Sequence, residues 1–130
     1  MTQRRILVID DSEVMLARIE AALSGAGYAV ITTTQAVGNA RYLASCELVI
    51  IDFHMPGIGG DSVVTSLRAA RGTRACPLFL YTSDDRAAAS HAELGFDGVF
   101  KGKGDEEGLV RQVNALFRVL DMRAEKERKG

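Results

Sequence analysis

Residues 48–60 read Leu-Val-Ile-Ile-Asp-Phe-His-Met-Pro-Gly-Ile-Gly-Gly, and the fold class follows from this stretch. Leu48–Ile51 is the most hydrophobic run of the chain, and a short apolar run bounded by turn residues predicts a buried strand. The run stops at a carboxylate, Asp52, and a loop with Pro56 and three glycines follows. The same arrangement, an apolar run that stops at a polar group, recurs before and after this stretch.

Four other apolar runs predict further strands, and segments with helical apolar spacing separate them. The expected strands, besides Leu48–Ile51, are Arg5–Ile9, Tyr28–Thr33, Pro77–Tyr81 and Gly98–Lys101. The expected helices are one that Ser12 can cap and that Gly25 and Gly27 end, then Gln35–Ser45, one through Val63, Val64 and Leu67, Asp84–Leu94, and Asp105–Arg123. Five strands in strict alternation with five helices predict a single α/β domain, a doubly wound five-stranded parallel sheet with helices on both faces.

The length and the composition fit one soluble globular domain. The chain has 130 residues, of which 47% are apolar and 25% are charged. We expect the domain to cover residues 1–123, and a charged, frayed tail or the start of a linker to cover residues 124–130. The formal net charge of −1 gives no electrostatic case for direct binding of nucleic acid.

The apolar runs are too short to cross a membrane, which takes about 20 consecutive apolar residues. The run that follows the two N-terminal arginines, Ile6–Ile9, is also too short for the core of a signal peptide. We therefore expect a cytoplasmic protein that makes no membrane contact.

The cysteines and the second histidine carry no signal of a metal site. Cys46 and Cys76 form no ligand pattern, and neither lies next to a histidine in the sequence. We expect both as small buried hydrophobic residues, and nothing in the chain argues for disulfides. His91 has no second candidate ligand three or four residues further on, so we expect its side chain to be packed or solvent-facing.

Polar groups follow four of the five expected strands. In a doubly wound sheet the ligand site lies outside the carboxyl ends of the strands, so these groups are expected to meet there. They are the pair Asp10 and Asp11, the single Asp52, the pair Thr82 and Ser83, and Lys101 or Lys103. Each one alone is commonly a turn residue, a helix cap or a surface charge, and only their joint occurrence indicates a site.

Three carboxylates at one edge of a sheet repel one another and raise each other's pKa values. A hard divalent cation removes this penalty, and Mg²⁺ suits a site with few carboxylates and several retained waters. A carboxylate can attack phosphorus and form an aspartyl phosphate. A lysine ammonium and a threonine hydroxyl would then serve the charged phosphoryl oxygens. The predicted site therefore has the parts of a phosphoryl acceptor.

Four segments resemble the receiver domains of two-component response regulators. They are ILVIDDSEVM (6–15), LVIIDFHMPGIGG (48–60), PLFLYTS (77–83) and GFDGVFKGKGDEEGL (95–109). The second is the most specific, because an aspartate followed by a Met-Pro-Gly turn after a buried strand is typical of this family. The resemblance covers essentially the whole chain and implies a flavodoxin-like fold. It also implies a switch that catalyses its own phosphorylation and dephosphorylation.

Carried over position by position, the resemblance implies that Asp52 is the phosphoacceptor. Asp11 would bind Mg²⁺ directly, together with Asp52 and the backbone carbonyl of His54. Asp10 would bind the ion through water. The phosphoryl donor would be a sensor histidine kinase, a histidine phosphotransfer protein or a small phosphodonor.

The resemblance also assigns roles to the end of the fourth strand. Thr82 would hydrogen-bond the phosphoryl group and move toward it on activation, and the small Ser83 would leave room for the donor. His54 and Asp84 each lie two residues after a key group, Asp52 or Thr82. We therefore expect both to flank the path of the attacking water and to tune the lifetime of the aspartyl phosphate. The signal would reach a downstream protein, a covalently linked output domain or a second copy of the chain through the fourth helix, the fifth strand and the last helix.

The lysine position departs from the family pattern, in which a proline follows the lysine. Neither Lys101 nor Lys103 is followed by proline, and an alignment without gaps places Gly102 at the expected position. Both lysines stay open, with a preference for Lys101 because it lies nearer the strand end. The family often has an aromatic residue in the fifth strand. If Lys101 is the site lysine, this position is Gly98, and if Lys103 is the site lysine, it is Phe100.

Three other functions share parts of this pattern. A pseudo-receiver that is never phosphorylated would fold alike and act as a protein-interaction module, and the lysine position favours it. The series Asp52-x-His54-x-x-Gly57 matches the DxHxxG motif of cobalamin-binding domains, but no Ser-x-Leu follows and two strands precede it. A haloacid-dehalogenase-type phosphatase needs a second acid two residues after its nucleophile, where this chain has His54 after Asp52.

Overall fold

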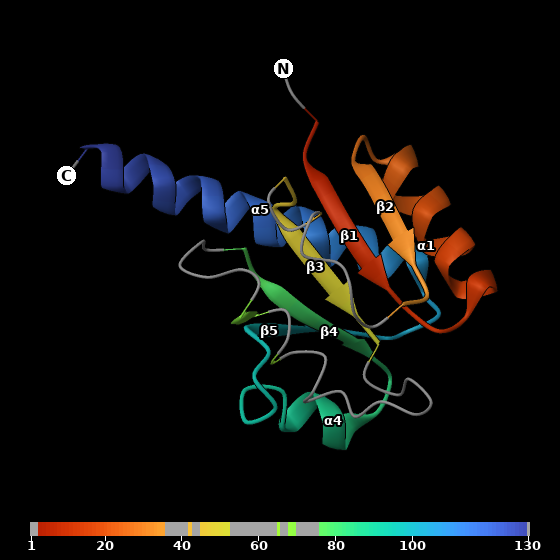
Figure 1. The fold of residues 1–130 in the computed structure, drawn as a ribbon. Helices are drawn as coiled ribbons and strands as arrows, with labels where there is room; N and C mark the ends of the chain where they lie inside the picture. Colours follow the sequence, from red (N-terminus) through yellow and green to blue (C-terminus); the bar gives the residue numbers. More distant parts are fainter. Residues whose placement is uncertain are drawn as a thin grey trace.

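One sheet of five strands forms the centre of the molecule (Figure 1). The structure, a computed structural model, describes residues 3–35, 42, 45–52, 65, 68–69 and 76–129. The strands are β1 (Arg5–Ile9), β2 (Ala29–Thr33), β3 (Leu48–Ile51), β4 (Leu78–Thr82) and β5 (Gly98–Lys101). Their order in the sheet is β2-β1-β3-β4-β5, and all neighbouring pairs are parallel. The predicted doubly wound parallel sheet is therefore confirmed.

The described helices are α1 (Glu13–Gly25), α4 (Asp85–Ala89) and α5 (Glu106–Lys129). The predicted start of α1 is confirmed, because the Ser12 hydroxyl accepts a hydrogen bond from the Met15 N–H at 3.2 Å. Its end is also as expected: the chain leaves the helix through Gly27, whose φ of 100° suits glycine. The helices expected at Gln35–Ser45 and through Val63–Leu67 lie for the most part outside the described residues.

Each face of the sheet carries its own hydrophobic core. On one face α1 and α5 pack side by side against the strands (Figure 1). Buried members of this cluster include Ile6, Val8, Leu16, Ile19, Leu23, Leu109, Val113 and Phe117. The opposite face carries α4 and a cluster that includes Leu7, Ile9, Val49, Leu80, Ala87 and Phe96. Cys46 and Cys76 belong to this second cluster, as predicted.

Two helix ends differ from expectation. The predicted helix Asp84–Leu94 is limited to Asp85–Ala89, and turns continue to Gly95. The half-buried ring of His91 lies with Nδ1 2.7 Å from the Ala88 carbonyl, and this contact favours a turn after Ala89. The turns that follow bring Phe96 into the core, where it is buried. His91 is therefore packed, one of the two outcomes expected for it.

The last helix is longer than expected, because α5 continues past Arg123 to Lys129. Residues 124–129 thus continue the helix and are not frayed, and their assignment as a tail or the start of a linker stays a prediction. This segment contains strong helix formers and neither glycine nor proline, so it can continue the helix although it is exposed. No helix in the described ranges is long and apolar enough to cross a membrane.

Candidate functional site

The carboxyl ends of β1 and β3 bring three carboxylates together. Ile9 and Ile51 are partners in the sheet, and the Asp52 N–H donates to the Ile9 carbonyl at 2.9 Å. Asp10 and Asp52 therefore leave neighbouring strands side by side. Together with Asp11 they offer one oxygen each, all within 4.8 Å of one another. The clustering expected from the strand ends is present.

The three carboxylates differ in their surroundings. Asp10 and Asp52 are buried, with 2% and 8% of their surface exposed, whereas Asp11 is exposed. Asp10 is oriented by the chain itself, because its Oδ1 accepts the Ser12 N–H at 2.9 Å. Loss of solvation, the hydrogen bond with Asp10 and the negative charge of Asp52 raise the pKa of Asp11. A cluster of three carboxylates attracts positive charge.

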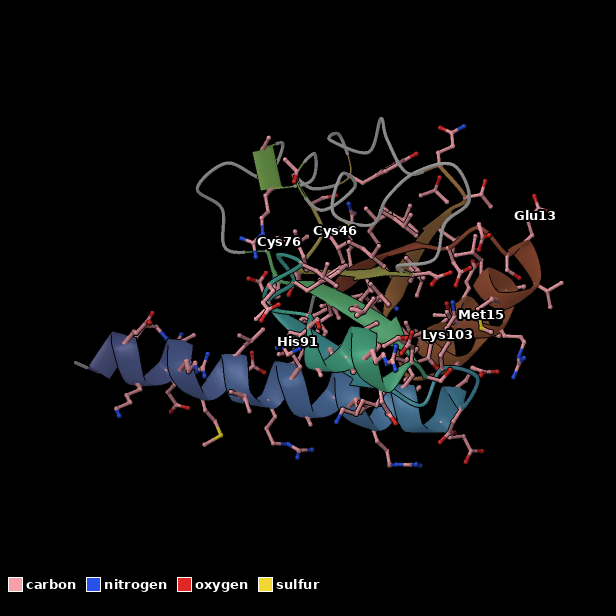
Figure 2. All side chains as sticks on the ribbon, turned by 90° about the horizontal axis from the view of Figure 1, so that it is seen from below. Glu13, Met15, Cys46, Cys76, His91 and Lys103 are labelled. Carbon is pink, nitrogen blue, oxygen red and sulfur yellow. The ribbon has the colours of Figure 1, made fainter. Side chains whose placement is uncertain are left out.

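Lys103, which is labelled in Figure 2, supplies a positive charge inside this cluster. Its Nζ lies 2.8 Å from Asp10 Oδ2 and 3.0 Å from Asp52 Oδ2, and the side chain is 19% exposed. Burial lowers the pKa of Lys103, but the hydrogen bonds to the two carboxylates outweigh it and the net shift is upward. Lys101 is exposed, and its backbone N–H and carbonyl pair with the Gln112 amide, both at 3.0 Å. The structure therefore brings Lys103, and not the preferred Lys101, to the carboxylates.

The position of Lys103 follows from the path of the loop after β5. The strand ends at Lys101, and Gly102 and Gly104 then adopt φ values of 75° and 107°, a region that side chains disfavour. These two left-handed residues turn the backbone so that the lysine between them points back over the sheet edge. The Gly-Lys-Gly pattern was visible in the sequence, but the direction of the turn was not.

With Lys103 at the carboxylates, the aromatic position of the fifth strand corresponds to Phe100. Its ring is buried, and the Phe79 ring lies 4.5 Å away, centroid to centroid. A Cβ at Gly98 would lie 2.4 Å from the Phe79 ring, so a side chain there would force this ring to shift. Phe100 belongs to the core between the sheet and the α1–α5 layer.

Thr82 ends β4, the strand next to β3, and is 4% exposed. Its hydroxyl oxygen accepts the Asp84 N–H at 2.9 Å, and the hydroxyl proton remains available for donation. Asp84 caps α4 by accepting from the Arg86 and Ala87 N–H groups, a role that the sequence had offered to Thr82 and Ser83. Ser83 is exposed. His54, predicted to bind the metal through its backbone carbonyl and to tune the phosphate lifetime through its side chain, lies outside the described residues.

The donor set fits a hard divalent cation. Carboxylate oxygens are the ligands that Mg²⁺ prefers, and it usually binds through one or two carboxylates while retaining several waters. The three oxygens of Asp10, Asp11 and Asp52 lie close enough together to share one such ion directly or through water. These residues would hold the metal, which would supply positive charge, and Lys103 would keep its contacts with Asp10 and Asp52.

Comparison with known proteins identifies the family. The sequence matches the family model of the response regulator receiver domain over residues 6–114. The chain therefore belongs to the receiver domains of two-component response regulators. It is 36% identical over 125 residues to the transcriptional regulatory protein PrrA of Mycobacterium tuberculosis, an alignment that covers 91% of this chain and 52% of PrrA. The chain thus spans about half the length of the PrrA proteins that it matches.

A relative of similar length is the protein PilH of Pseudomonas aeruginosa, which is 28% identical over 118 residues, 87% of this chain and 97% of PilH. Solved structures agree with the fold. The chemotaxis response regulator CheY4 of Vibrio cholerae superposes with a TM-score of 0.75 at 20% identity, over 88% of this chain and 98% of CheY4. TrrA of Thermotoga maritima, solved in complex with Mg²⁺ and a beryllium fluoride, gives 0.73 at 23% identity, over 88% of this chain and 99% of TrrA.

Proposed function

We propose that this receiver domain is a magnesium-dependent phosphoacceptor switch, and that Asp52 takes the phosphoryl group. The observation that carries the proposal is the position of Lys103, whose Nζ lies 2.8 Å from Asp10 and 3.0 Å from Asp52. A half-buried cation at that place would neutralise charge on Asp10 and Asp52. Receiver domains bind Mg²⁺ at an acidic pocket, and the cluster of three carboxylates would serve as this pocket here.

The reaction exchanges a P–N bond for a P–O bond. One Asp52 oxygen attacks the phosphorus of a phosphohistidine on a histidine kinase or a histidine phosphotransfer protein, and the leaving imidazole takes up a proton. Bound Mg²⁺ would neutralise charge on the phosphoryl oxygens. The Lys103 ammonium and the Thr82 hydroxyl would donate hydrogen bonds to the same oxygens. Attack by water on the acyl phosphate returns Asp52 to its starting state.

The signal would leave the site through Thr82. Its hydroxyl accepts from the backbone of Asp84, which caps α4, so a movement of Thr82 toward a phosphoryl group changes the contact that starts this helix. Only two residues of α4, Ala87 and Ala88, are buried. An element held by two small side chains can shift between two positions at low cost, and phosphorylation biases that equilibrium through the new contact.

The surface that changes would comprise α4, β5 and α5. A downstream protein, an output domain in a longer protein or a second copy of this chain would bind there. Among the relatives, the aligned part of the chain covers about half of PrrA and nearly all of PilH.

Mass spectrometry of the intact protein after incubation with acetyl phosphate and Mg²⁺ tests the proposal. We expect the mass of one phosphoryl group to be gained, and we expect no gain with Asp52→Asn or without divalent cations. Asp97→Asn is the control, because it also removes a carboxylate, but one at the amino ends of the strands, away from the site. There Asp97 accepts a hydrogen bond from the Leu78 N–H. No gain in the wild-type protein would favour the pseudo-receiver instead.

A further inference from the structure

Lys103 lies on a loop and not on a strand, so something other than the sheet must hold it in place. The loop consists of residues 102–105, between the end of β5 and the start of α5. Glycine has the largest backbone freedom of all residues, and two glycines flank the lysine. No proline follows to stiffen the loop. The short distances from Lys103 to Asp10 and Asp52 therefore require external restraints.

The first restraint is the hydroxyl of Tyr81, which lies beneath the loop. The Gly104 N–H donates to this hydroxyl at 3.2 Å. The hydroxyl can donate to the carbonyl of Asp105 at 3.4 Å or of Gly102 at 3.5 Å, one at a time, because it has a single proton. The Tyr81 ring itself is 1% exposed and packed in the core between the sheet and the α1–α5 layer. A rigid side chain thus contacts both ends of the loop.

The second restraint comes from α1. Arg18 donates from its terminal nitrogen to the Gly104 carbonyl at 3.0 Å and from Nε to Glu106 Oε1 at 2.6 Å. The other oxygen of Glu106 is buried and has no hydrogen-bond partner among the described residues. The ion pair with Arg18 therefore stabilises the negative charge of this carboxylate. Both backbone polar groups of Gly104, the residue after Lys103, are therefore fixed.

We propose that Tyr81 and Arg18 are positioning residues that hold the Lys103 loop against the sheet edge, so that the ammonium group stays between Asp10 and Asp52. Tyr81 directly precedes Thr82 on β4. The lysine and the threonine, which would contact the same phosphoryl group, are thus placed relative to each other by one residue. The consequence for phosphorylation rests on the proposed function, but the restraint on the loop does not.

Amide hydrogen exchange of Tyr81→Phe tests the restraint directly. This variant keeps the packed ring and removes only the hydroxyl. We expect exchange of the Gly104 amide to rise about tenfold, the effect of losing one ordinary hydrogen bond, while exchange in β1 and β3 stays unchanged. Tyr28→Phe is the matched control, because the Tyr28 hydroxyl bonds Asn114 of α5 away from the loop, and Gly104 exchange should not respond to it.

Unchanged Gly104 exchange in Tyr81→Phe would overturn the proposal, whether or not Asp52 is a phosphoacceptor. Arg18→Gln gives a second test that leaves the core intact. It removes the ion pair with Glu106, and we expect exchange in the loop to rise there as well. If Tyr81→Phe does not fold, protection of the loop in Arg18→Gln equal to that of the wild type would overturn the proposal.

A double-mutant cycle separates positioning of the lysine from a general loss of structure. The rate of phosphorylation by acetyl phosphate is measured in the wild type, Tyr81→Phe, Lys103→Ala and the double variant. We expect Tyr81→Phe to lower the rate severalfold in the wild-type background and to have no further effect without Lys103. Equal losses in both backgrounds would overturn the proposal. If the wild type gains no phosphoryl group, the proposed function fails, and Gly104 exchange alone decides the restraint.

Discussion

Replacing Asp11 by asparagine should stabilise the metal-free protein, because it removes one of three negative charges held close together. At the 4.8 Å limit of the cluster, one carboxylate pair repels by about 3.5 kcal/mol at an effective dielectric constant of 20 and by about 0.9 kcal/mol in water. Asp11 is exposed, and Lys103 partly compensates the other two charges, so the lower figure applies. We expect Asp11→Asn to gain about 1 kcal/mol in the free energy of unfolding, or about 4 °C in Tm.

Urea denaturation with a chelator and with excess Mg²⁺ measures this difference. In the chelator Asp11→Asn should be more stable than the wild type. In Mg²⁺ the order should reverse, because an ion that binds only the folded state at 100 times its Kd stabilises the wild type by about 2.7 kcal/mol. Glu20→Gln removes an exposed carboxylate of α1 outside the cluster and should show neither effect. A loss of stability in the chelator would refute the repulsion argument.

The pH dependence provides a further check on the same variant. The folded-state pKa of Asp11 is raised above the ordinary value of about 3.9, so the folded protein binds this proton more tightly than the unfolded chain. The penalty from the ionised group is fully present above the folded pKa, and it disappears as the pH falls through that value to below about 3.9. The advantage of Asp11→Asn should vanish over the same range. An advantage that persists unchanged at low pH would have another cause.

Three further outcomes are expected. Gly98→Ala should cost about 1–3 kcal/mol by chemical denaturation, since its Cβ would overlap the Phe79 ring, and a smaller loss would show that the ring moves aside freely. The double variant His54→Ala, Asp84→Ala should lengthen the lifetime of the aspartyl phosphate, because both polar side chains would flank the path of the attacking water. An unchanged decay rate would remove this assignment. Amide shifts on phosphorylation should cluster in residues 83–104 and α5, and shifts confined to the loops after β1 and β3 would contradict the signalling route.

The sheet could be predicted from the sequence because its strands are marked at both ends. The expected bounds of β1, β3 and β5 agree with the structure. In β1 and β3 an apolar run stops at a carboxylate, Asp10 or Asp52, so the polarity of the side chains changes within one residue. The same boundaries fixed the place of the three carboxylates, since parallel strands bring their carboxyl ends to one edge.

The lysine and the helix ends could not be predicted in the same way. Which lysine reaches the carboxylates depends on the φ values of Gly102 and Gly104, and a glycine is compatible with both signs of φ. The contacts of the Tyr81 hydroxyl join residues more than 20 positions apart, so no local sequence pattern could predict them. The end of α5 could not be predicted, because helix propensities alone are a weak guide in an exposed, charged segment. The helix continues there because no glycine or proline ends it before Lys129.

The ion pair between Arg4 and Asp121 has a consequence for the order of folding. Arg4 lies just before β1, donates to Asp121 of α5 at 2.6 Å and covers the Phe117 ring at 4.4 Å. The paired residues are 117 positions apart, and closing a free loop of that length costs about 4 kcal/mol of chain entropy. An exposed ion pair gives back about 1 kcal/mol at most. The contact can therefore form only after the sheet has assembled and placed α5, so the outer turns of α5 should fold last and open first.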